Sequence, residues 1–101
     1  MNKSEIIRNL SYRLSDMPTA DVDRAVNLLL DFLGSTIAAG NRCEVRGFGV
    51  FSRRTREARA SRNPKTGAVL ALPARYTTHF KPGKELRERV DNAKGDYQIQ
   101  D

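Results

Sequence analysis

The sequence predicts an α+β fold in which two N-terminal helices precede a three-stranded antiparallel sheet, extended into a long β-ribbon arm, and a short C-terminal helix. Three observations support this prediction. Apolar residues recur at helical spacing over residues 6–37, and they alternate with polar residues around positions 42–46. From Arg53 to Ala68 the only apolar side chains are alanines and Pro64, among six basic residues and one acidic residue. A stretch of this composition cannot pack into a core, so we expect it to project from the folded body.

The first helix is predicted to begin at Asn2, because Asn2 and Glu5 are spaced as a capping box. Its apolar side chains recur every four positions, at Ile6, Leu10 and Leu14. This spacing is typical of an amphipathic helix with one buried face. The helix is expected to end between Asp16 and Pro18.

A second helix is predicted from the N-cap residue Thr19 to the C-cap residue Gly40. One apolar stripe along it consists of Val22, Val26, Leu29, Leu33 and Ile37. Further apolar side chains, outside that stripe, are Leu28, Leu30 and Phe32. A helix that is apolar on more than one side must bury more than one side, so a second subunit is the simplest cover.

The segment from Asn41 to Phe51 is typical of a strand, a turn and a second strand. Cys43 and Val45 alternate with polar neighbours, which gives the first strand one face for the core and one for solvent. A tight connection is expected at residues 47–49. The residues expected in the core of a dimer are Val26, Leu29, Leu30, Phe32, Leu33, Phe48, Phe51 and Phe80.

The basic stretch is predicted to form one long strand of an arm, with a turn at residues 63–67 and a return strand from Val69 to Phe80. Alternation along a continuous strand places Arg53 and Arg59 on one face. The arginines on the other face are Arg54, Arg56 and Arg62. Both faces are basic, so neither is a core face, and such a ribbon is expected to be mobile without a ligand.

The C-terminal helix is predicted to begin at Pro82, whose missing N–H costs nothing at the first helical position. It is expected to continue to Val90, and residues 91–101 are predicted to form a polar, disordered tail. Residues 1–90 then make up a single domain. Its body consists of residues 1–52 and 76–90, and its arm consists of residues 53–75.

The distribution of charge favours a polyanionic partner. The chain has a net charge of +6, yet residues 41–90 alone carry thirteen basic and four acidic side chains, a net charge of +9. Clustered positive charge of this size attracts phosphate backbones and gives salt-sensitive binding. A surface that only aids solubility usually mixes both signs. Nucleic acid is therefore the expected partner.

Catalysis, metal binding and export have little support in the sequence. One histidine, His79, and one cysteine, Cys43, are too few for a metal site, and the sequence has no obvious carboxylate pair or phosphate-binding loop. We therefore expect no enzymatic activity and no cofactor. Cys43 cannot form an intramolecular disulfide, and no apolar run resembles a signal peptide or a membrane span. These features predict a cytoplasmic protein.

Pro64, at the expected tip of the arm, has two interpretations. The proline can simply make the turn. Alternatively its rigid apolar ring, which has no N–H to leave unsatisfied, can insert between base pairs while neighbouring arginines hold phosphates or the minor groove. Composition alone favours neither interpretation.

Three motifs follow one another along the chain. They are Arg46-Gly47-Phe48-Gly49-Val50-Phe51, Arg62-Asn63-Pro64-Lys65-Thr66-Gly67 and His79-Phe80-Lys81-Pro82-Gly83-Lys84-Glu85-Leu86-Arg87. They closely resemble the bacterial histone-like HU and integration host factor family, and the resemblance covers residues 1 to about 90. Within that family, Arg42, Glu44 and Arg46 and the run from His79 to Arg89 most resemble the beta subunits of integration host factor.

The resemblance implies an intertwined dimer with two arms in the minor groove of duplex DNA, a sharp bend in that DNA, and intercalation by Pro64. The arm residues that it implies for DNA contact are Arg53, Arg54, Arg56, Arg59, Arg62, Asn63, Lys65 and Arg75. The corresponding residues of the body are Lys3, Arg42, Glu44, Arg46, Lys81 and Lys84. The second subunit is expected to be a related alpha-type chain or an identical one. The expected setting is the nucleoid, in recombination, replication and the regulation of transcription and translation.

The arm departs from the family pattern at Ser61, where glycine is usual, and at Ala58, where proline is often found beside Glu57. Other functions stay open. An HU-like homodimer that binds DNA without sequence preference fits the same features. A basic RNA-binding protein would need exposed aromatic side chains for base stacking. A structural protein could use the same arm to bind an acidic partner.

Overall fold

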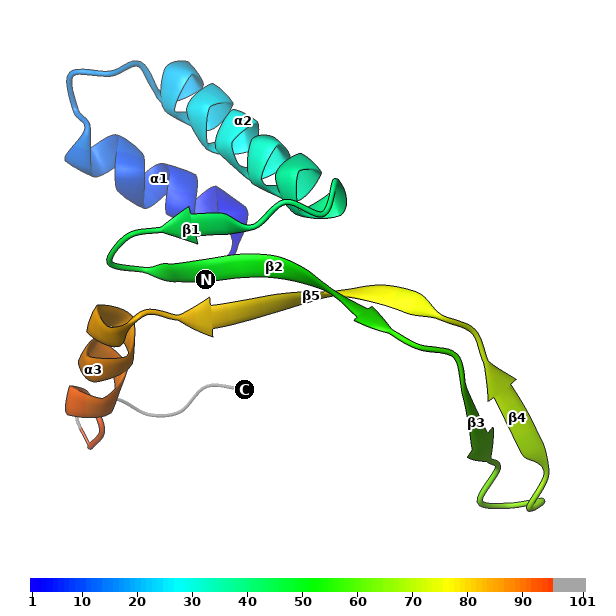
Figure 1. Ribbon diagram of the computed structural model, residues 1–101. Coiled ribbons are helices and arrows are strands. Elements are labelled where there is room, and N and C mark those ends of the chain that lie inside the picture. The colour runs from blue at the N-terminus through cyan, green and yellow to red at the C-terminus, as the bar shows by residue number, and fades with distance from the viewer. Residues whose placement is uncertain (96–101) are drawn as a thin grey trace. The chain divides into compact units, whose positions relative to one another are not determined.

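The computed structural model describes residues 1–95 and divides the chain into two compact units. The first ends at Thr36 and contains the first helix and all but the last two residues of the second. The second unit begins at Ile37 and contains the sheet, the arm and the last helix (Figure 1). Helices and antiparallel strands occur in the predicted order, so the α+β fold class is confirmed.

Helix α1 (Lys3–Arg13) begins as predicted and ends early. The Asn2 side-chain oxygen Oδ1 accepts a hydrogen bond from the Glu5 backbone N–H at 2.9 Å, which is one half of the predicted capping box. Leu14 then leaves the helical region at φ −107° and ψ 56°, although its N–H still bonds to Leu10 O. The predicted end near Asp16 to Pro18 is therefore wrong by about one turn.

Helix α2 (Thr19–Ala38) starts one position earlier than its predicted N-cap implies. The Pro18 carbonyl accepts hydrogen bonds from the N–H groups of Asp21 and Val22, at 2.9 and 3.2 Å. Pro18 therefore takes the role predicted for Thr19. At the other end, Gly40 adopts φ +87° and donates its N–H to Ile37 O, which confirms the predicted stop.

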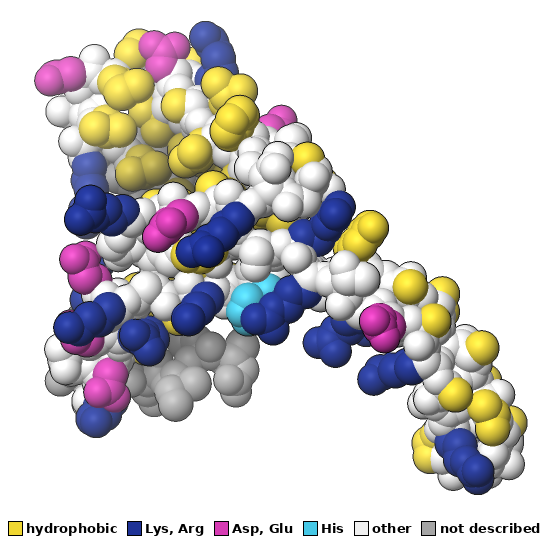
Figure 2. Space-filling model, in the orientation of Figure 1, with side chains coloured by type: hydrophobic (Ala, Val, Ile, Leu, Met, Phe, Trp, Pro, Cys, Tyr) yellow, Lys and Arg dark blue, Asp and Glu magenta, His cyan; other side chains and the backbone are white. Residues whose placement is uncertain are grey.

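The helical unit has a very small core. Among residues 1–95 the only buried apolar side chains are Ile7 and Val22, which are 8% and 2% exposed. Leu29 and Phe32 of α2 are 66% and 71% exposed, and hydrophobic side chains gather over the helices on the face shown in Figure 2. Burying a side chain of this size is worth about 1.5–3 kcal/mol, so this apolar surface requires a cover.

In the second unit, β1 (Cys43–Val45), β2 (Gly49–Arg56) and β5 (Arg75–Pro82) form an antiparallel sheet in the order β1-β2-β5. The predicted core aromatics Phe48, Phe51 and Phe80 gather at one end of this sheet, with ring centroids 4.6–6.3 Å apart. Gly49 is buried beside them. A β-carbon at position 49 would lie only 2.6 Å from the Phe80 ring, so the cluster depends on this glycine.

The arm consists of two ribbon sections instead of one continuous ribbon (Figure 1). β2 and β5 pair as far as Arg56 and Arg75, and β3 (Arg59–Arg62) then pairs with β4 (Val69–Leu72) in the same register. Two residues on each strand, positions 57–58 and 73–74, are left out of both ladders. Their side chains are Glu, Ala, Pro and Ala, all depleted in strands, which accounts for the interruption.

Helix α3 (Lys84–Asn92) has Gly83 as its N-cap residue. Pro82 is the last residue of β5, so the prediction that it opens the helix is wrong by two positions. The proline fits there because it stands at the end of the strand, opposite Gly49. The helix also includes residues 91 and 92, which were predicted as tail, and residues 96–101 lie outside the described part of the chain.

Candidate nucleic-acid interface

A tight turn at residues 63–68 exposes Pro64 at the end of the arm. Asn63 N–H donates to Ala68 O at 2.9 Å, and Gly67 N–H donates to Asn63 O at 2.8 Å. The Asn63 side chain accepts from Lys65 N–H, and Gly67 adopts φ +72°, a region that favours glycine. The turn thus holds its own shape, while the Pro64 ring faces solvent.

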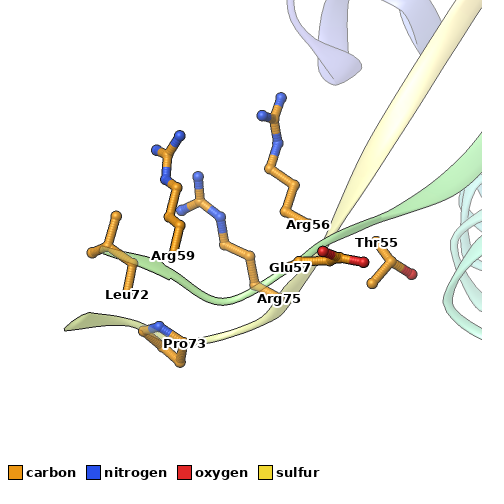
Figure 3. Close-up of a pocket in the computed structure, with 7 residues that line it drawn as sticks. All are labelled: Thr55, Arg56, Glu57, Arg59, Leu72, Pro73 and Arg75. Atoms are coloured by element: carbon orange, nitrogen blue, oxygen red, sulfur yellow. The ribbon is translucent and has the colours of Figure 1, made fainter. Parts of the chain in front are cut away.

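Three arginines line one cavity at the interruption between the two ribbon sections of the arm. Arg56, Arg59 and Arg75 come from β2, β3 and β5, and their guanidinium groups point the same way (Figure 3). They border a cavity of about 370 Å³ whose lining is Thr55, Arg56, Glu57, Arg59, Leu72, Pro73 and Arg75. The ion pairs seen within residues 1–95 involve other side chains, so this positive charge is left for an external anion.

The position of Arg59 differs from the expectation of a continuous strand. At the end of the sheet remote from the arm, Phe48 O accepts from Gly83 N–H, so the backbone N–H and C=O groups of the even-numbered residues of β2 point toward β5. At the tip Asn63 N–H donates to Ala68 O, so the odd-numbered residues of β3, 59 and 61, are the ones whose backbone N–H and C=O groups point toward β4. In a two-stranded ribbon, all residues whose backbone N–H and C=O groups point toward the partner strand project their side chains on the same face. Positions 56 and 59 therefore share a face, and the alternation predicted across the whole arm is wrong.

The other predicted arm cations differ in what surrounds them. Arg53 donates from Nη1 to Ala38 O at 3.0 Å, and its guanidinium lies 4.0 Å from the centroid of the Tyr76 ring. Arg54, Arg62 and Lys65 are exposed. In Figure 2, Lys and Arg side chains follow one another along the sheet and arm of the second unit.

Strand β4 carries apolar side chains that sequence reasoning did not assign to the interface. Its four residues, Val69–Leu72, are all apolar, and Val69 is 66% exposed. Arg62 pairs with Val69, and Arg59 pairs with Leu72, so two of the four apolar side chains stand beside a cation. Four consecutive apolar residues within a ribbon basic on both faces were the available signal. This combination suits a DNA groove, where phosphates flank apolar sugar surfaces.

The predicted body residues are accessible and weakly paired. In the first unit, Lys3 Nζ donates to Asn27 Oδ1 at 2.7 Å. Arg42 lies 3.8 Å from Glu44, and both side chains are 67% exposed. Lys84 lies 3.9 Å from Glu88 within α3. Exposed pairs of this kind contribute about 0–1 kcal/mol, so they leave the cations available to a stronger anion.

Arg46 and Lys81 complete the predicted set and are exposed in the β1–β2 turn and in β5. The part of the chain that the structure describes contains no group of three His, Cys, Asp or Glu side chains able to hold a metal ion. None of its helices has the length and apolar character needed to span a membrane.

Comparison with known proteins finds close relatives of the whole folded region. A family model described as bacterial DNA-binding protein matches residues 1–91. The integration host factor subunit beta of Xylella fastidiosa is 53% identical over 90 residues, covering 89% of this chain and 86% of the relative. The corresponding subunit of Stenotrophomonas maltophilia is 52% identical over 92 residues, covering 91% of each chain.

A solved structure shares the fold. The HU–DNA cocrystal structure from Anabaena superposes with a TM-score of 0.80 at 32% identity, covering 89% of this chain and 97% of the other. The similarity therefore extends over the helices, the sheet and the arm together.

Proposed function

The chain belongs to the family of bacterial DNA-binding proteins, and we propose that it is one subunit of an architectural dimer that bends duplex DNA. The arm lies in the minor groove and Pro64 inserts between base pairs, as minor-groove architectural proteins, including members of this family, do with apolar side chains. The observation that carries this proposal is the exposed Pro64 at the end of a cationic arm.

Electrostatics provides the affinity. The three arginines at the bend, with the exposed Arg54 and Lys65, can each displace counterions from a phosphate. If each subunit neutralises about six phosphates, the slope of log affinity against log salt for a dimer is on the order of −10. The body cations add contacts on the flanks, and Arg42, Glu44 and Arg46 help to distinguish preferred sequences.

The turn at the end of the arm, which carries Pro64, produces the bend in the DNA. Opening a base step costs a few kcal/mol, and bending a site costs about 1–6 kcal/mol more. A ring without an N–H leaves no donor unsatisfied between two bases, and Asn63 and Gly67 hold the turn closed behind it. The bend is favourable overall because it brings more phosphates to the protein surface.

A second subunit covers the exposed apolar face of α2. Leu29 and Phe32 need such a cover, and the relatives named above are themselves subunits. The partner is a related alpha-type chain or an identical copy, and the dimer core includes Leu29, Leu30, Phe32 and Leu33 of α2. The dimer acts in the cytoplasm, on the nucleoid, in recombination, replication and gene regulation. We assign it no catalytic role and no cofactor.

The variant Pro64→Ala tests the intercalation. Energy transfer between dyes at the two ends of a duplex measures the bend, and titration at several salt concentrations measures affinity. Pro64→Ala should reduce the bend more than the affinity. The control, Lys65→Ala, should lower affinity and salt slope while the bend persists. An unchanged bend angle in Pro64→Ala refutes intercalation, and unbent DNA in the wild-type complex refutes the architectural role.

Footprinting on random and A-tract-flanked duplexes tests sequence preference. Protection of one preferred site supports the contribution of Arg42, Glu44 and Arg46 to discrimination. Uniform protection would instead indicate the HU-like homodimer, which binds without preference.

A further inference from the structure

We propose that Arg53, the first residue of the arm, is a positioning residue and does not bind a phosphate. Its side chain links the start of the arm to the C-terminal end of α2. This inference rests on the proposed function, because a bent complex requires an arm held in one direction. Arg53 lies in β2, and its Nη1 donates to the carbonyl of Ala38, the last residue of α2, at 3.0 Å. Both residues belong to the second compact unit.

The C-terminal end of α2 is a suitable partner for a guanidinium. The last carbonyls of a helix lack N–H partners and carry partial negative charge from the aligned peptide dipoles. Within the last turn of α2 the structure shows no basic side chain. Arg53 therefore supplies from 15 positions away the cation that the helix itself lacks there.

Gly40 makes room for this contact. A β-carbon at position 40 would lie 2.8 Å from Nη2 and 3.1 Å from the central guanidinium carbon of Arg53. Its φ of +87° also favours glycine. Gly40 thus ends the helix and leaves the guanidinium space beside the helix end.

Tyr76 holds the face of the same guanidinium. The central guanidinium carbon of Arg53 lies 4.0 Å from the centroid of the Tyr76 ring, a distance typical of a cation–π contact. Arg53 pairs with Thr78 and Thr55 pairs with Tyr76, so Arg53 and Tyr76 are diagonal neighbours on one face of the ribbon. Tyr76 as a whole is 64% exposed. One edge and one face of Arg53 are therefore already engaged within the protein.

Arg54 is the matched control. It follows Arg53 in β2, it is exposed, and within residues 1–95 its side chain has neither a helix end nor an aromatic ring as a partner. Both residues carry one positive charge at the root of the arm. Their difference lies in the contacts and not in the charge.

Substitutions that keep or remove the charge separate positioning from phosphate binding in the intact dimer. Arg53→Lys keeps the charge but loses the planar fork and face. It should reduce the DNA bend and speed amide exchange in β2 and β5 several-fold, with the salt slope unchanged. Gly40→Ala should have the same effects. Arg54→Lys should leave the bend and the exchange as in the wild type.

The alanine variants complete the comparison. Arg54→Ala should reduce the magnitude of the salt slope by about 0.9 for each phosphate that a subunit then leaves unneutralised, whereas Arg53→Ala should leave the slope near the wild-type value. An Arg53→Ala slope that falls as far as that of Arg54→Ala overturns the inference. So does an Arg53→Lys variant that matches the wild type in bend and exchange.

A spectroscopic measurement on the free dimer makes the test independent of DNA. The side-chain Nε–H resonance of Arg53 should be shifted upfield by the Tyr76 ring, and the shift should persist in Tyr76→Phe and vanish in Tyr76→Leu. Absence of this shift in the wild type overturns the inference. If the shift and the exchange effect are present but the wild-type protein does not bend DNA, the proposed function fails while the interaction between Arg53 and Tyr76 stands.

Discussion

Arg56 and Arg75 lie directly opposite each other on β2 and β5, at the last pair before the arm bends. Like charges in this position destabilise a ribbon by roughly 0.2–1 kcal/mol, and Arg59 adds a third positive charge on the same face. A phosphate placed among the three would remove the repulsion. The proposed DNA contact therefore predicts that arm stability and DNA affinity are opposed at this site.

Replacing Arg75 with glutamine should separate these two properties. Arg75→Gln should slow amide exchange in the free arm, because the repulsion with Arg56 is gone, while affinity for DNA falls and the salt slope becomes shallower. Exchange and salt titrations on the same protein measure both effects. Arg54→Gln is the control, because Arg54 lies opposite Thr77 and has no like charge directly opposite it. Faster exchange in Arg75→Gln would contradict the opposition.

The exposed face of α2 should be required for dimer formation. Leu29→Asp places a charge on the face that the proposed dimer buries, which would cost several kcal/mol. The purified protein should therefore sediment mainly as monomer and melt at lower temperature. Tyr12→Asp, at an exposed aromatic residue of α1, should remain dimeric. A Leu29→Asp protein with wild-type mass would place the interface elsewhere.

Two glycines should respond in opposite ways to alanine. Gly49→Ala forces a β-carbon to 2.6 Å from the Phe80 ring and 2.7 Å from Lys81 O, so it should destabilise the protein by about 1–3 kcal/mol. Gly34→Ala, within α2, has nothing within 4 Å and should stabilise the helix by about 0.5–1 kcal/mol. Denaturant unfolding measures both. Equal effects at the two positions would count against the close packing of Gly49.

Proline should be tolerated at the unpaired positions of the arm and not in the β3–β4 ribbon. Ala58→Pro falls in the unpaired segment, breaks no ladder pair and should stiffen the arm, giving tighter DNA binding. Ser61→Pro falls at the pair with Leu70 and should disrupt the outer ribbon. Exchange of the β3 and β4 amides reports the difference. If both substitutions disrupted the β3–β4 ribbon equally, residues 57–58 would be held by backbone pairing, contrary to the structure.

Local signals predicted most of the fold. The Asn2 cap, the stop at Gly40 and the strand at Cys43–Val45 depend on neighbours within a few positions, and each is confirmed. The core face predicted for that strand is wrong at Val45, which is 43% exposed. The start of α3 was misplaced because Pro82 suits both the first turn of a helix and the end of a strand. Only its pairing with Gly49 decides between them.

The geometry of the arm could not be predicted in the same way. Composition identified the arginines and Pro64. Their assignment to the two faces of the ribbon assumed that side chains alternate along one uninterrupted strand. The gathering of Arg56, Arg59 and Arg75 depends on a change in backbone orientation across four unpaired residues. The contact between Arg53 and Ala38 depends on the course of the chain around Gly40, and no local pattern marks it.

The interruption of the arm has the same length on both strands, with two residues unpaired on each side. The β3–β4 ribbon consequently resumes in the residue pairing of the β2–β5 ribbon, and Asn63 pairs with Ala68 at the tip, although the residues turned toward their partner are now the odd-numbered ones. An insertion of one residue on a single strand would shift every outer pair and turn the Pro64 ring away from its direction. Arms of different length should therefore arise through matched insertions, one in each strand, so that evolution changes their reach in paired steps.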